Sequence, residues 1–590
     1  MERSWVAPRG LVAWLGTVDH KKIGARYLVT AAVFFVAGGL EAAALRAQLA
    51  RPDQSLLGPE AYDQLYSMHG LTMIFLFVTP MLSGFGNYLV PLMIGARDMA
   101  FPRLNAFGYW VFLAAGLFLY SGLVLGKAPD NGWFNYAPLS IAPFSEGPNI
   151  DFYALGLLFL GISTTAGAVN FIVTILKLRA PGMSINRMPI FCWAVLATSI
   201  SIVFAIPSLS VATGLLELQR EWGFHFFDTA GGGDPVLWQH LFWIFGHPDV
   251  YIIFLPAVGI VSTIVPVFSR RSLVAYEWVA LATMATALLG FGVWVHHMFA
   301  VGLPQVSLTF FAAASTIIAI PSGIQVFAWL ATMLKGRPVI RTPFLYVLGF
   351  LVTFVVGGLS GVMFAAIPFD QQVTDSYFVV AHFHYVLFGG AVFPIFAGVH
   401  YWFPKITGRM LDERLGQASF WLVFVGFNLA FFPMHVSGLL GMPRRVYTYP
   451  ADMGWDAYNL LSSIGALVLV LGVLAIVVNV AIGIVRGAPA GPDPWGANTL
   501  EWSTSSPPPA YNFARIPVVR SADPRWDGLS GPSDLVLPEG RRTPATLPLD
   551  ADPAAALEMP SESLVPLAAA IAIALVCVGL IAGLDWLAVA

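Results

Sequence analysis

Apolar stretches long enough to cross a membrane recur along almost the whole chain, and they constrain its fold more than any other feature. A helix needs about 20 apolar residues to span the hydrocarbon core of a bilayer. Of the 590 residues, 57% are hydrophobic and 11% are charged, whereas soluble domains carry about 25% charged residues. The sequence therefore predicts an all-α polytopic membrane protein. A sliding window predicts thirteen spans, at 26–50, 65–93, 105–127, 152–178, 189–213, 237–266, 275–302, 305–334, 344–368, 377–404, 416–438, 456–485 and 564–588.

The loops between these spans alternate in charge, and this pattern predicts the orientation of the chain. Basic loops, such as the one with Arg97 and Arg103, alternate with loops that are acidic or poor in lysine and arginine. The positive-inside rule places the basic loops and the N-terminus in the cytoplasm. The expected regions are a cytoplasmic N-terminal segment at 1–25, a twelve-helix domain at 26–486, a cytoplasmic Pro-rich linker at 487–562 and an additional transmembrane helix at 563–590.

Charge and cysteine content exclude several classes of function. A net charge of −3 gives no indication of nucleic-acid binding. Only two cysteines occur, Cys192 and Cys577, and both lie inside apolar stretches. This argues against disulfides, iron–sulfur clusters and thiolate copper sites.

Histidines at lipid depth are functional candidates, because a buried imidazole is costly in lipid without a partner. His382 and His384 are two residues apart in VVAHFHYVLFGG. On a helix they diverge by about 200°, so one helix can present axial ligands to two hemes, one on each side. A second axial imidazole leaves the heme iron without an open coordination position and makes it low-spin. His69 in the second span is the candidate for this second ligand. For His400 and His435, each alone in its segment, a hydrogen bond to a neighbouring carbonyl is the favoured interpretation.

Two further patterns indicate a second metal. His247 and Tyr251 in WIFGHPDVY are four residues apart and share one helix face. His296 and His297 are adjacent, so they diverge by about 100° on a regular helix and need a local distortion to converge; Gly302 and Pro304 follow just beyond. Three imidazoles without a thiolate suit a copper ion that binds substrate. The alternative is a polar network among three helices.

These residues lie in motifs through which the chain resembles subunit I of the heme-copper oxygen reductases, in the A-type branch. The resemblance covers His20 to about Phe513 and includes NYLVPLMIGARDMAFPRLN, WIFGHPDVY, VWVHHMF, VVAHFHY, GMPRR and TLEWSTSSPPPAYNF. It implies a twelve-helix bundle with two hemes and one copper ion. The extra C-terminal helix has no place in that bundle.

The resemblance also implies roles for individual residues. Low-spin heme ligands would be His69 and His384, the high-spin heme ligand His382, and the copper ligands His247, His296 and His297. Tyr251 would be the active-site tyrosine that is cross-linked to His247. Residues beside the heme propionates would be Arg444, Arg445, Trp243, Asp370 and Asp375, and Arg46 would lie near the low-spin heme. Two adjacent guanidiniums on the predicted outer face also need carboxylates. Arg46 could instead be a snorkelling charge.

Proton delivery is where the chain departs from the family. Asp98, with Asn87 and Asn105, matches the start of the main uptake path; the alternative for Asp98 is a solvated acid paired with Arg97. Asp249 stands where the family usually has a glutamate. On the second path, Gln325 replaces the usual lysine and cannot carry a proton as an ammonium does. Ser262 and Ser322 remain at polar positions along that route.

Three functions follow, in order of preference. The first is a terminal respiratory oxidase of a prokaryotic inner membrane, reducing O2 to water with proton uptake. A partner like subunit II would supply electrons from cytochrome c or quinol, and other membrane subunits would complete the complex. The second is a nitric oxide reductase, which converts two NO to N2O and fits the changes at Asp249 and Gln325. The third is a transporter without heme, against which the absence of an internal repeat counts. The heme type, a, o or b, stays open.

Overall fold

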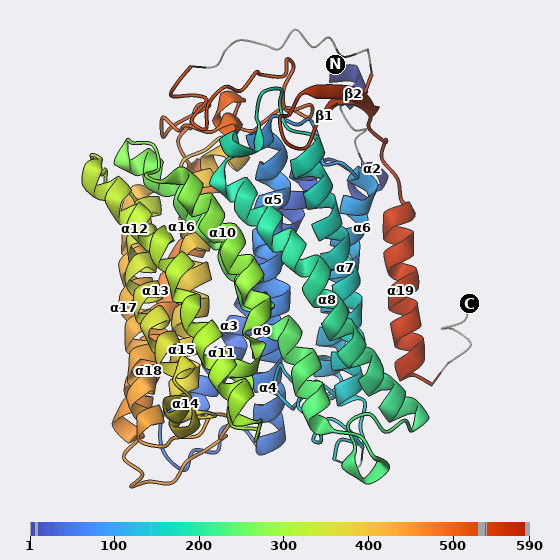
Figure 1. Cartoon of the computed structure of the whole chain (residues 1–590), viewed down its shortest axis with the longest axis vertical. Helices are drawn as coiled ribbons and strands as arrows, with labels where there is room; N and C mark the ends of the chain where they lie inside the picture. The colour runs from blue at the N-terminus through green and yellow to red at the C-terminus, as the bar shows by residue number, and fades with distance from the viewer. Residues whose placement is uncertain (1, 6–9, 143, 529–536, 538–539, 584–590) are drawn as a thin grey trace.

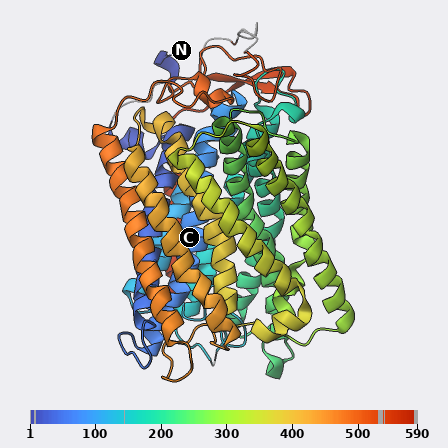
Figure 2. The same cartoon turned by 90° about the vertical axis from the view of Figure 1, so that its left-hand side faces the viewer.

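The computed structural model describes residues 2–5, 10–142, 144–528, 537 and 540–583. Long helices run side by side along the long axis of the molecule (Figures 1 and 2). The segment that follows the twelfth predicted span covers one end of this bundle together with the start of the chain (Figure 1). We call this end the hairpin end, because it carries the two-stranded sheet.

Within the described part of the chain, eleven helices are long and apolar enough to cross a membrane. They are α3 (His20–Gln48), α4–η1–α5 (Pro59–Leu71, Thr72–Val78, Thr79–Ile94), α6 (Pro102–Val124), α7 (Asn149–Lys177), α8 (Ile190–Trp222), α9 (Pro235–Ser269), α11–α12 (Gln305–Ile317, Ala319–Lys335), α13 (Thr342–Ala365), α15–η6–α16 (Tyr377–Leu387, Phe388–Val392, Phe393–Thr407), α17 (Glu413–Leu439) and α18 (Asp456–Arg486). The other elements are α1 (Glu2–Trp5), α2 (Leu11–Leu15), η2 (Ile185–Arg187), η3 (Thr229–Gly231), α10 (Tyr276–Leu289), η4 (Gly290–Gly292), η5 (Trp294–Met298), α14 (Ile367–Val373), η7 (Leu500–Ser503), β1 (Arg542–Thr546), β2 (Pro553–Glu558) and α19 (Val565–Ile581). This confirms the all-α membrane fold.

Two predicted spans differ from the elements that form. The span predicted at 275–302 is a regular helix only as far as the end of α10, and two 3₁₀ turns, η4 and η5, follow it. The thirteenth predicted span corresponds to α19, which has 17 residues and packs against α6 and α7. The predicted end of that span, 584–588, lies outside the described residues. A thirteenth crossing therefore stays a prediction.

Small residues let the helices approach closely, as is typical of packing inside membranes. A Cβ atom on Gly465 of α18 would lie 2.3 Å from the backbone nitrogen of Ala430 on α17. One on Gly426 of α17 would lie 2.4 Å from the backbone nitrogen of Leu469 on α18. Both distances are far below a van der Waals contact, so this helix pair is built around its glycines.

The described residues of the segment 487–562, namely 487–528, 537 and 540–562, lie over the hairpin end. Leu500 and Trp502 are fully buried and belong to the main apolar core. The Nζ atom of Lys405 at the end of α16 donates to the carbonyl oxygens of Pro492 and Thr504, at 3.0 and 2.9 Å. Strands β1 and β2 pair antiparallel. Burial of apolar side chains against the bundle stabilises this position of the segment.

Candidate functional site

Three histidines from two elements converge inside the bundle. His247 comes from α9, and His296 and His297 come from η5; one ring nitrogen of each lies within 4.8 Å of the others. His297 Nε2 lies 3.2 Å from His247 Nδ1 and 3.1 Å from His296 Nε2. Imidazole nitrogens bind a metal at about 2.0–2.1 Å, so three nitrogens this close fit a shared ion.

The expected distortion around the adjacent histidines is present, but it begins before them. The α-helix ends at Leu289, and the pair sits in the 3₁₀ turn η5, upstream of Gly302 and Pro304. Gly290 lies in the first distorted turn, where a Cβ atom would be 2.7 Å from Cδ2 of Tyr251. Gly290 therefore makes room for the tyrosine ring, a role that sequence spacing alone does not signal.

Neighbouring side chains orient the three rings. His297 stacks on Trp243 with ring centroids 3.8 Å apart and planes at 8°, and Trp243 Nε1 donates to the Tyr136 hydroxyl at 2.6 Å. Ser315 Oγ donates to Phe311 O, so it accepts from His296 Nδ1 at 2.7 Å. That hydrogen bond leaves His296 Nε2 without a proton, as a metal ligand requires.

His247 is oriented towards both the other histidines and the tyrosine. Its Nδ1 faces His297, and its Nε2 is buried without a hydrogen-bond partner. The Tyr251 ring lies beside it, with centroids 4.7 Å apart. Sequence reasoning found His247, His297, Trp243 and Tyr251, but it missed Ser315, Tyr136 and Gly290, because these come from other elements and carry no motif.

The two histidines of α15 point in opposite directions, as their spacing predicts. His382 Nδ1 donates to Gly357 O on α13 at 3.1 Å and also lies 2.9 Å from Ser360 Oγ. His384 Nδ1 donates to Val380 O at 2.8 Å, and its ring stacks on Phe431 of α17 at 4.1 Å. In both rings Nδ1 holds the proton, so each Nε2 is free to bind a metal.

Each α15 histidine has its own group of neighbours. His384 lies within electrostatic range of His69, whose Nδ1 donates to Gly38 O at 2.9 Å. His382 lies within the same range of His296 and His297. The rings of His69, His382 and His384 lie deep in the bundle, yet each keeps part of its surface uncovered by protein. These rings fit two hemes, one between His69 and His384 and one on His382 facing the three converging histidines.

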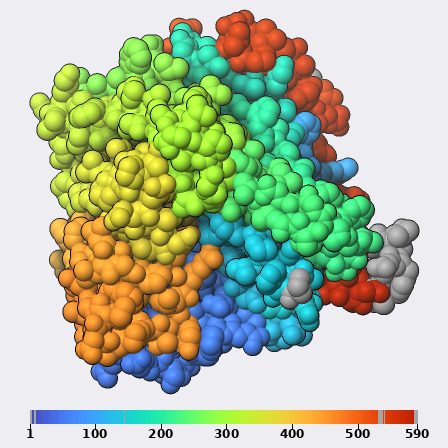
Figure 3. Space-filling view, turned by 60° about the horizontal axis from the view of Figure 1, so that its bottom comes forward, coloured from blue at the N-terminus to red at the C-terminus, as the bar shows by residue number. Residues whose placement is uncertain are grey.

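An arginine pair lies at the opposite end of the bundle from the hairpin. Figure 3 looks onto this end, where the segments near residues 50 (blue), 140 (cyan) and 450 (orange) lie side by side. Arg444 Nε donates to Asp375 Oδ1 at 2.8 Å. Among the described residues, the buried Nε and Nη2 atoms of Arg445 have no hydrogen-bond partner, and the guanidinium lies over the Phe134 ring at 4.3 Å. A buried, unpaired guanidinium fits an anionic group such as a heme propionate.

Asp370 on α14 belongs to the same region. Burial raises the pKa of its carboxyl to about 7, and the nearby Asp375 carboxylate adds to the rise. Arg46 near the end of α3 is bound to α18, where its Nη2 donates to Asn459 O at 3.0 Å and Ser463 Oγ at 3.2 Å. Its Nε is buried without a partner.

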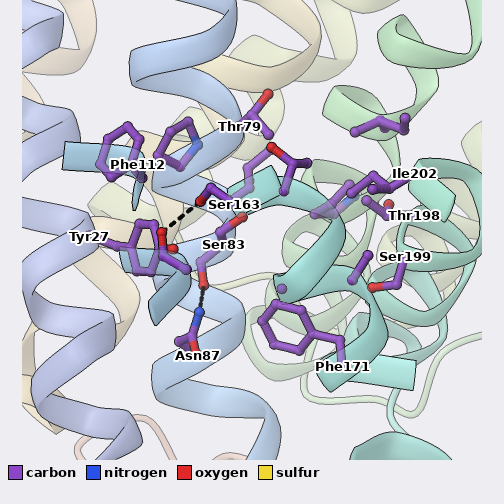
Figure 4. Close-up of a pocket in the computed structure, with 18 of the residues that line it drawn as sticks. Tyr27, Thr79, Ser83, Asn87, Phe112, Ser163, Phe171, Thr198, Ser199 and Ile202 are labelled. Carbon is purple, nitrogen blue, oxygen red and sulfur yellow. Dashed lines mark hydrogen bonds between the residues drawn. The ribbon is translucent and has the colours of Figure 1, made fainter. Parts of the chain in front are cut away.

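A cavity of about 60 Å³, lined by both apolar side chains and hydroxyl and amide groups, lies among α5, α6, α7, α8 and α9. Figure 4 shows Asn87, Ser83, Ser163 and Ser199 around it. Asn105 also lines the cavity, which extends to residues of α9. By the same measure a water needs roughly 10–15 Å³, so about four waters fit. Buried amide atoms of Asn87 (Oδ1) and Asn105 (Nδ2) have no protein partner, which suits bound water.

Asp98 lies in the loop between α5 and α6, and it is not a solvated acid. Its side chain is buried, and its Oδ1 accepts from the backbone N–H of Met99 at 2.8 Å. Arg97 does not pair with it, because its guanidinium donates to the carbonyl oxygens of Phe513, Ala514 and Arg542. The alternative of a solvated Asp98–Arg97 pair is therefore wrong. Burial raises the pKa of Asp98 to about 7, with the Asp19 carboxylate adding to the rise.

Polar residues expected on the second path form separate local pairs. Gln325 Nε2 donates to Thr283 Oγ1 at 3.1 Å, and Ser262 Oγ accepts from Trp329 Nε1 at 2.9 Å. Ser322 Oγ donates to a carbonyl of its own helix at 3.2 Å. His400 and His435, for comparison, each donate from Nδ1 to the carbonyl of a residue one turn earlier.

Comparisons with known proteins agree with this geometry. A family model described as "Cytochrome C and Quinol oxidase polypeptide I" matches residues 22–468. The chain is 48% identical to "Cytochrome c oxidase subunit 1" of Bacillus sp. (strain PS3), over 94% of this chain and 89% of that protein. It is 51% identical to "Putative cytochrome c oxidase subunit 1-beta" of Streptomyces coelicolor, over 88% of this chain and 91% of that protein.

A solved heme-copper terminal oxidase dimer superposes with a TM-score of 0.67 at 20% identity, over 79% of this chain and 84% of that one, and supports the fold. Because its relatives are bacterial and its helices are apolar, the protein is an integral protein of a prokaryotic membrane. Its histidines match the two hemes and one copper ion of its family. This chain belongs to the cytochrome c and quinol oxidase polypeptide I family and is subunit I of a heme-copper oxidoreductase.

Proposed function

We propose that this chain is the catalytic subunit of a membrane terminal oxidase, which reduces O2 to water with four electrons and four protons. The observation that carries this proposal is the convergence of His247, His296 and His297 within electrostatic range of His382. When bound, the hemes and the copper would pass on electrons from a donor and provide the site where oxygen is reduced. The protein holds these groups and excludes bulk water around them.

The side chains around this centre have distinct tasks. His247, His296 and His297 bind the copper, and Trp243 fixes the plane of His297 by stacking. His382 holds the high-spin heme, while His69 and His384 hold the low-spin heme. Arg444 and Arg445 bind propionates, with Asp370 and Asp375 beside them and Arg46 near the low-spin heme. Tyr251, whose ring lies beside His247, would supply a proton at this site.

Protons reach this centre through this cavity. Asp98 receives protons at the hairpin end, and waters between Asn87 and Asn105 carry them to α9. Ile252, which lines the cavity, is one helical turn from Asp249. Asp249 is buried two residues from His247, so it can pass protons on. The second path is interrupted, because Gln325 cannot carry a proton and is bound to Thr283.

Electrons come from a separate subunit, because this chain has no cysteine pair for a dinuclear copper site. That partner resembles subunit II and takes electrons from cytochrome c or quinol, and other membrane subunits complete the complex. The N-terminus and the hairpin end face the cytoplasm, since basic loops lie there. The regions 1–25, 26–486, 487–562 and 563–590 act as N-terminal segment, catalytic domain, covering segment and additional helix.

Tyr251→Phe tests whether oxygen reduction needs the hydroxyl group beside the three histidines. The variant keeps the ring that packs on Gly290 but loses the hydroxyl, so it should retain both hemes and copper. We expect turnover with O2 to fall by about 10²-fold, as for loss of a positioned proton donor. An oxygen electrode and a nitric oxide electrode on the purified complex measure both activities. If the parent complex reduces NO but not O2, the oxidase proposal is wrong.

Asp98→Asn tests the uptake path through its pH dependence. A carboxyl with a pKa of about 7 is protonated below that pH and ionised above it, so turnover limited by uptake should fall as pH rises through 7. We expect Asp98→Asn to lower turnover by about 10²-fold and to abolish this step, while Asp98→Glu keeps it. Steady-state oxygen consumption from pH 6 to 9 measures both. A pH profile unchanged in Asp98→Asn would contradict the assignment.

A further inference from the structure

An apolar groove of about 570 Å³ lies on the outer surface between α10 and α12, which run side by side in Figure 1. Its lining includes Trp278 of α10 and Ile320, Gly323 and Phe327 of α12. Trp278, Ile320 and Phe327 are 60 to 72% exposed, so the groove opens away from the bundle. None of the candidate heme or copper ligands lines this groove.

The groove ends at a cluster of basic residues at the hairpin end. Arg270 and Arg271 follow α9, while Lys335 and Arg337 lie at the end of α12, and all four are exposed. Arg271 Nη1 donates to Lys335 O at 3.4 Å, and the Arg337 amide donates to Ser269 O at 2.8 Å, so the two pairs lie together. None of the four forms a salt bridge within the described chain.

The same hydrogen bonding ties the cluster to the groove. The backbone N–H of Val274, which lines the groove, donates to Thr332 Oγ1 on α12 at 2.9 Å. Ala331, the groove residue nearest the end of α12, is one turn before Lys335. Glu277 and Asp523 lie within electrostatic range of Tyr276 at the start of α10, and neither forms a salt bridge with the four cations within the described chain. The site thus has an apolar part and, next to it, a basic part that forms no salt bridge within the described chain.

The length of the groove indicates what fills it. Along α12 it runs from Ala319 to Ala331, about 18 Å at 1.5 Å per residue. Half of a bilayer's hydrocarbon core is about 15 Å, so the groove spans one leaflet and stops. A transmembrane helix of a partner would cross both leaflets. The exposed indole of Trp278 lies in the first turn of α10, at the level where tryptophan meets lipid headgroups.

We propose that this groove binds one anionic phospholipid of the leaflet at the hairpin end. One acyl chain lies between α10 and α12, and the phosphate contacts Arg270, Arg271, Lys335 and Arg337. Anionic headgroups are attracted by such basic clusters at a membrane surface. The apolar lining excludes a soluble anion, and the cation cluster distinguishes anionic from zwitterionic lipid.

Gly323→Leu tests the apolar part. A Cβ atom at Gly323 would meet no atom within 4 Å, so leucine fills the groove without disturbing the bundle and replaces a poor helix former. The matched control is Gly214→Leu on α8, where a Cβ atom also meets nothing within 4 Å. The quadruple variant R270Q/R271Q/K335Q/R337Q tests the headgroup part, and the reduced optical spectrum reports folding in all three.

The measurement is native mass spectrometry of the intact complex, after exchange into nanodiscs of phosphatidylglycerol or phosphatidylcholine. We expect one tightly retained phosphatidylglycerol in the parent and in Gly214→Leu, and at least tenfold less in Gly323→Leu and in the quadruple variant. Equal retention in Gly323→Leu and Gly214→Leu would overturn the proposal. So would equal retention of phosphatidylcholine, or a partner subunit cross-linked to the groove in place of lipid.

Discussion

His297→Ala should leave the purified complex without copper and almost without oxygen reduction. His297 Nε2 lies nearest to both other histidines, at 3.2 and 3.1 Å, so its removal breaks the three-nitrogen site at its centre. Loss of a residue that merely orients a ligand costs about 10–100-fold in metal affinity or activity, and loss of a ligand should cost more than about 100-fold. Metal analysis and oxygen consumption measure the two effects.

Two variants serve as references for this prediction. Ser315→Ala removes the acceptor of His296 Nδ1 and should weaken copper retention by only about 10–100-fold. His400→Asn changes another buried histidine, which bonds only to the carbonyl of Phe396, and should keep copper and turnover. Full copper content in His297→Ala would show that the three histidines form a structural polar network.

His382→Ala and His384→Ala should each remove one heme, and not the same one. The two rings point to opposite sides of α15, towards α13 and α17. We expect a pyridine hemochrome assay to find one heme per complex in either variant and two in the parent. Only His384→Ala should lose the low-spin signal in electron paramagnetic resonance, because only its iron has two imidazoles.

Turnover should fall by more than about 10³-fold in both variants, since electron transfer and oxygen reduction each need one of the hemes. His435→Ala, on α17, provides the control, because its ring bonds to the carbonyl of Phe432 and should leave both hemes in place. If His382→Ala and His384→Ala lost the same heme, or neither lost any, the two-heme arrangement would be wrong.

Local periodicity explains why part of the site could be predicted from the sequence. The angle between His382 and His384 depends only on helix geometry, and α15 is regular through both residues. The shared face of His247 and Tyr251 follows in the same way from four-residue spacing, and their rings lie 4.7 Å apart. Apolar length predicted thirteen spans, because the bilayer itself sets that length, and eleven of them correspond to helices of the described chain that are long and apolar enough to cross a membrane.

Other parts depended on contacts between distant segments. The 3₁₀ turns that carry His296 and His297 begin at Gly290, where Tyr251 of another helix occupies the space of a side chain. Asp98 lies in a loop whose charged residues suggest exposure to solvent. Carbonyl oxygens of the segment 487–562 instead accept hydrogen bonds from Arg97, and this segment covers the loop. No pattern near either residue could signal these contacts.

Composition and helix geometry were therefore enough to predict most membrane-spanning helices, the opposite directions of His382 and His384, and the candidate ligands. Which ligands meet, which ring nitrogens are left free, how deeply Asp98 is buried and where the groove lies could be seen only once the chain was folded. Those features arise from packing between elements far apart in the chain. The approach of His247 Nδ1 on α9 to within 3.2 Å of His297 Nε2 on η5, across 50 residues of chain, is one such case.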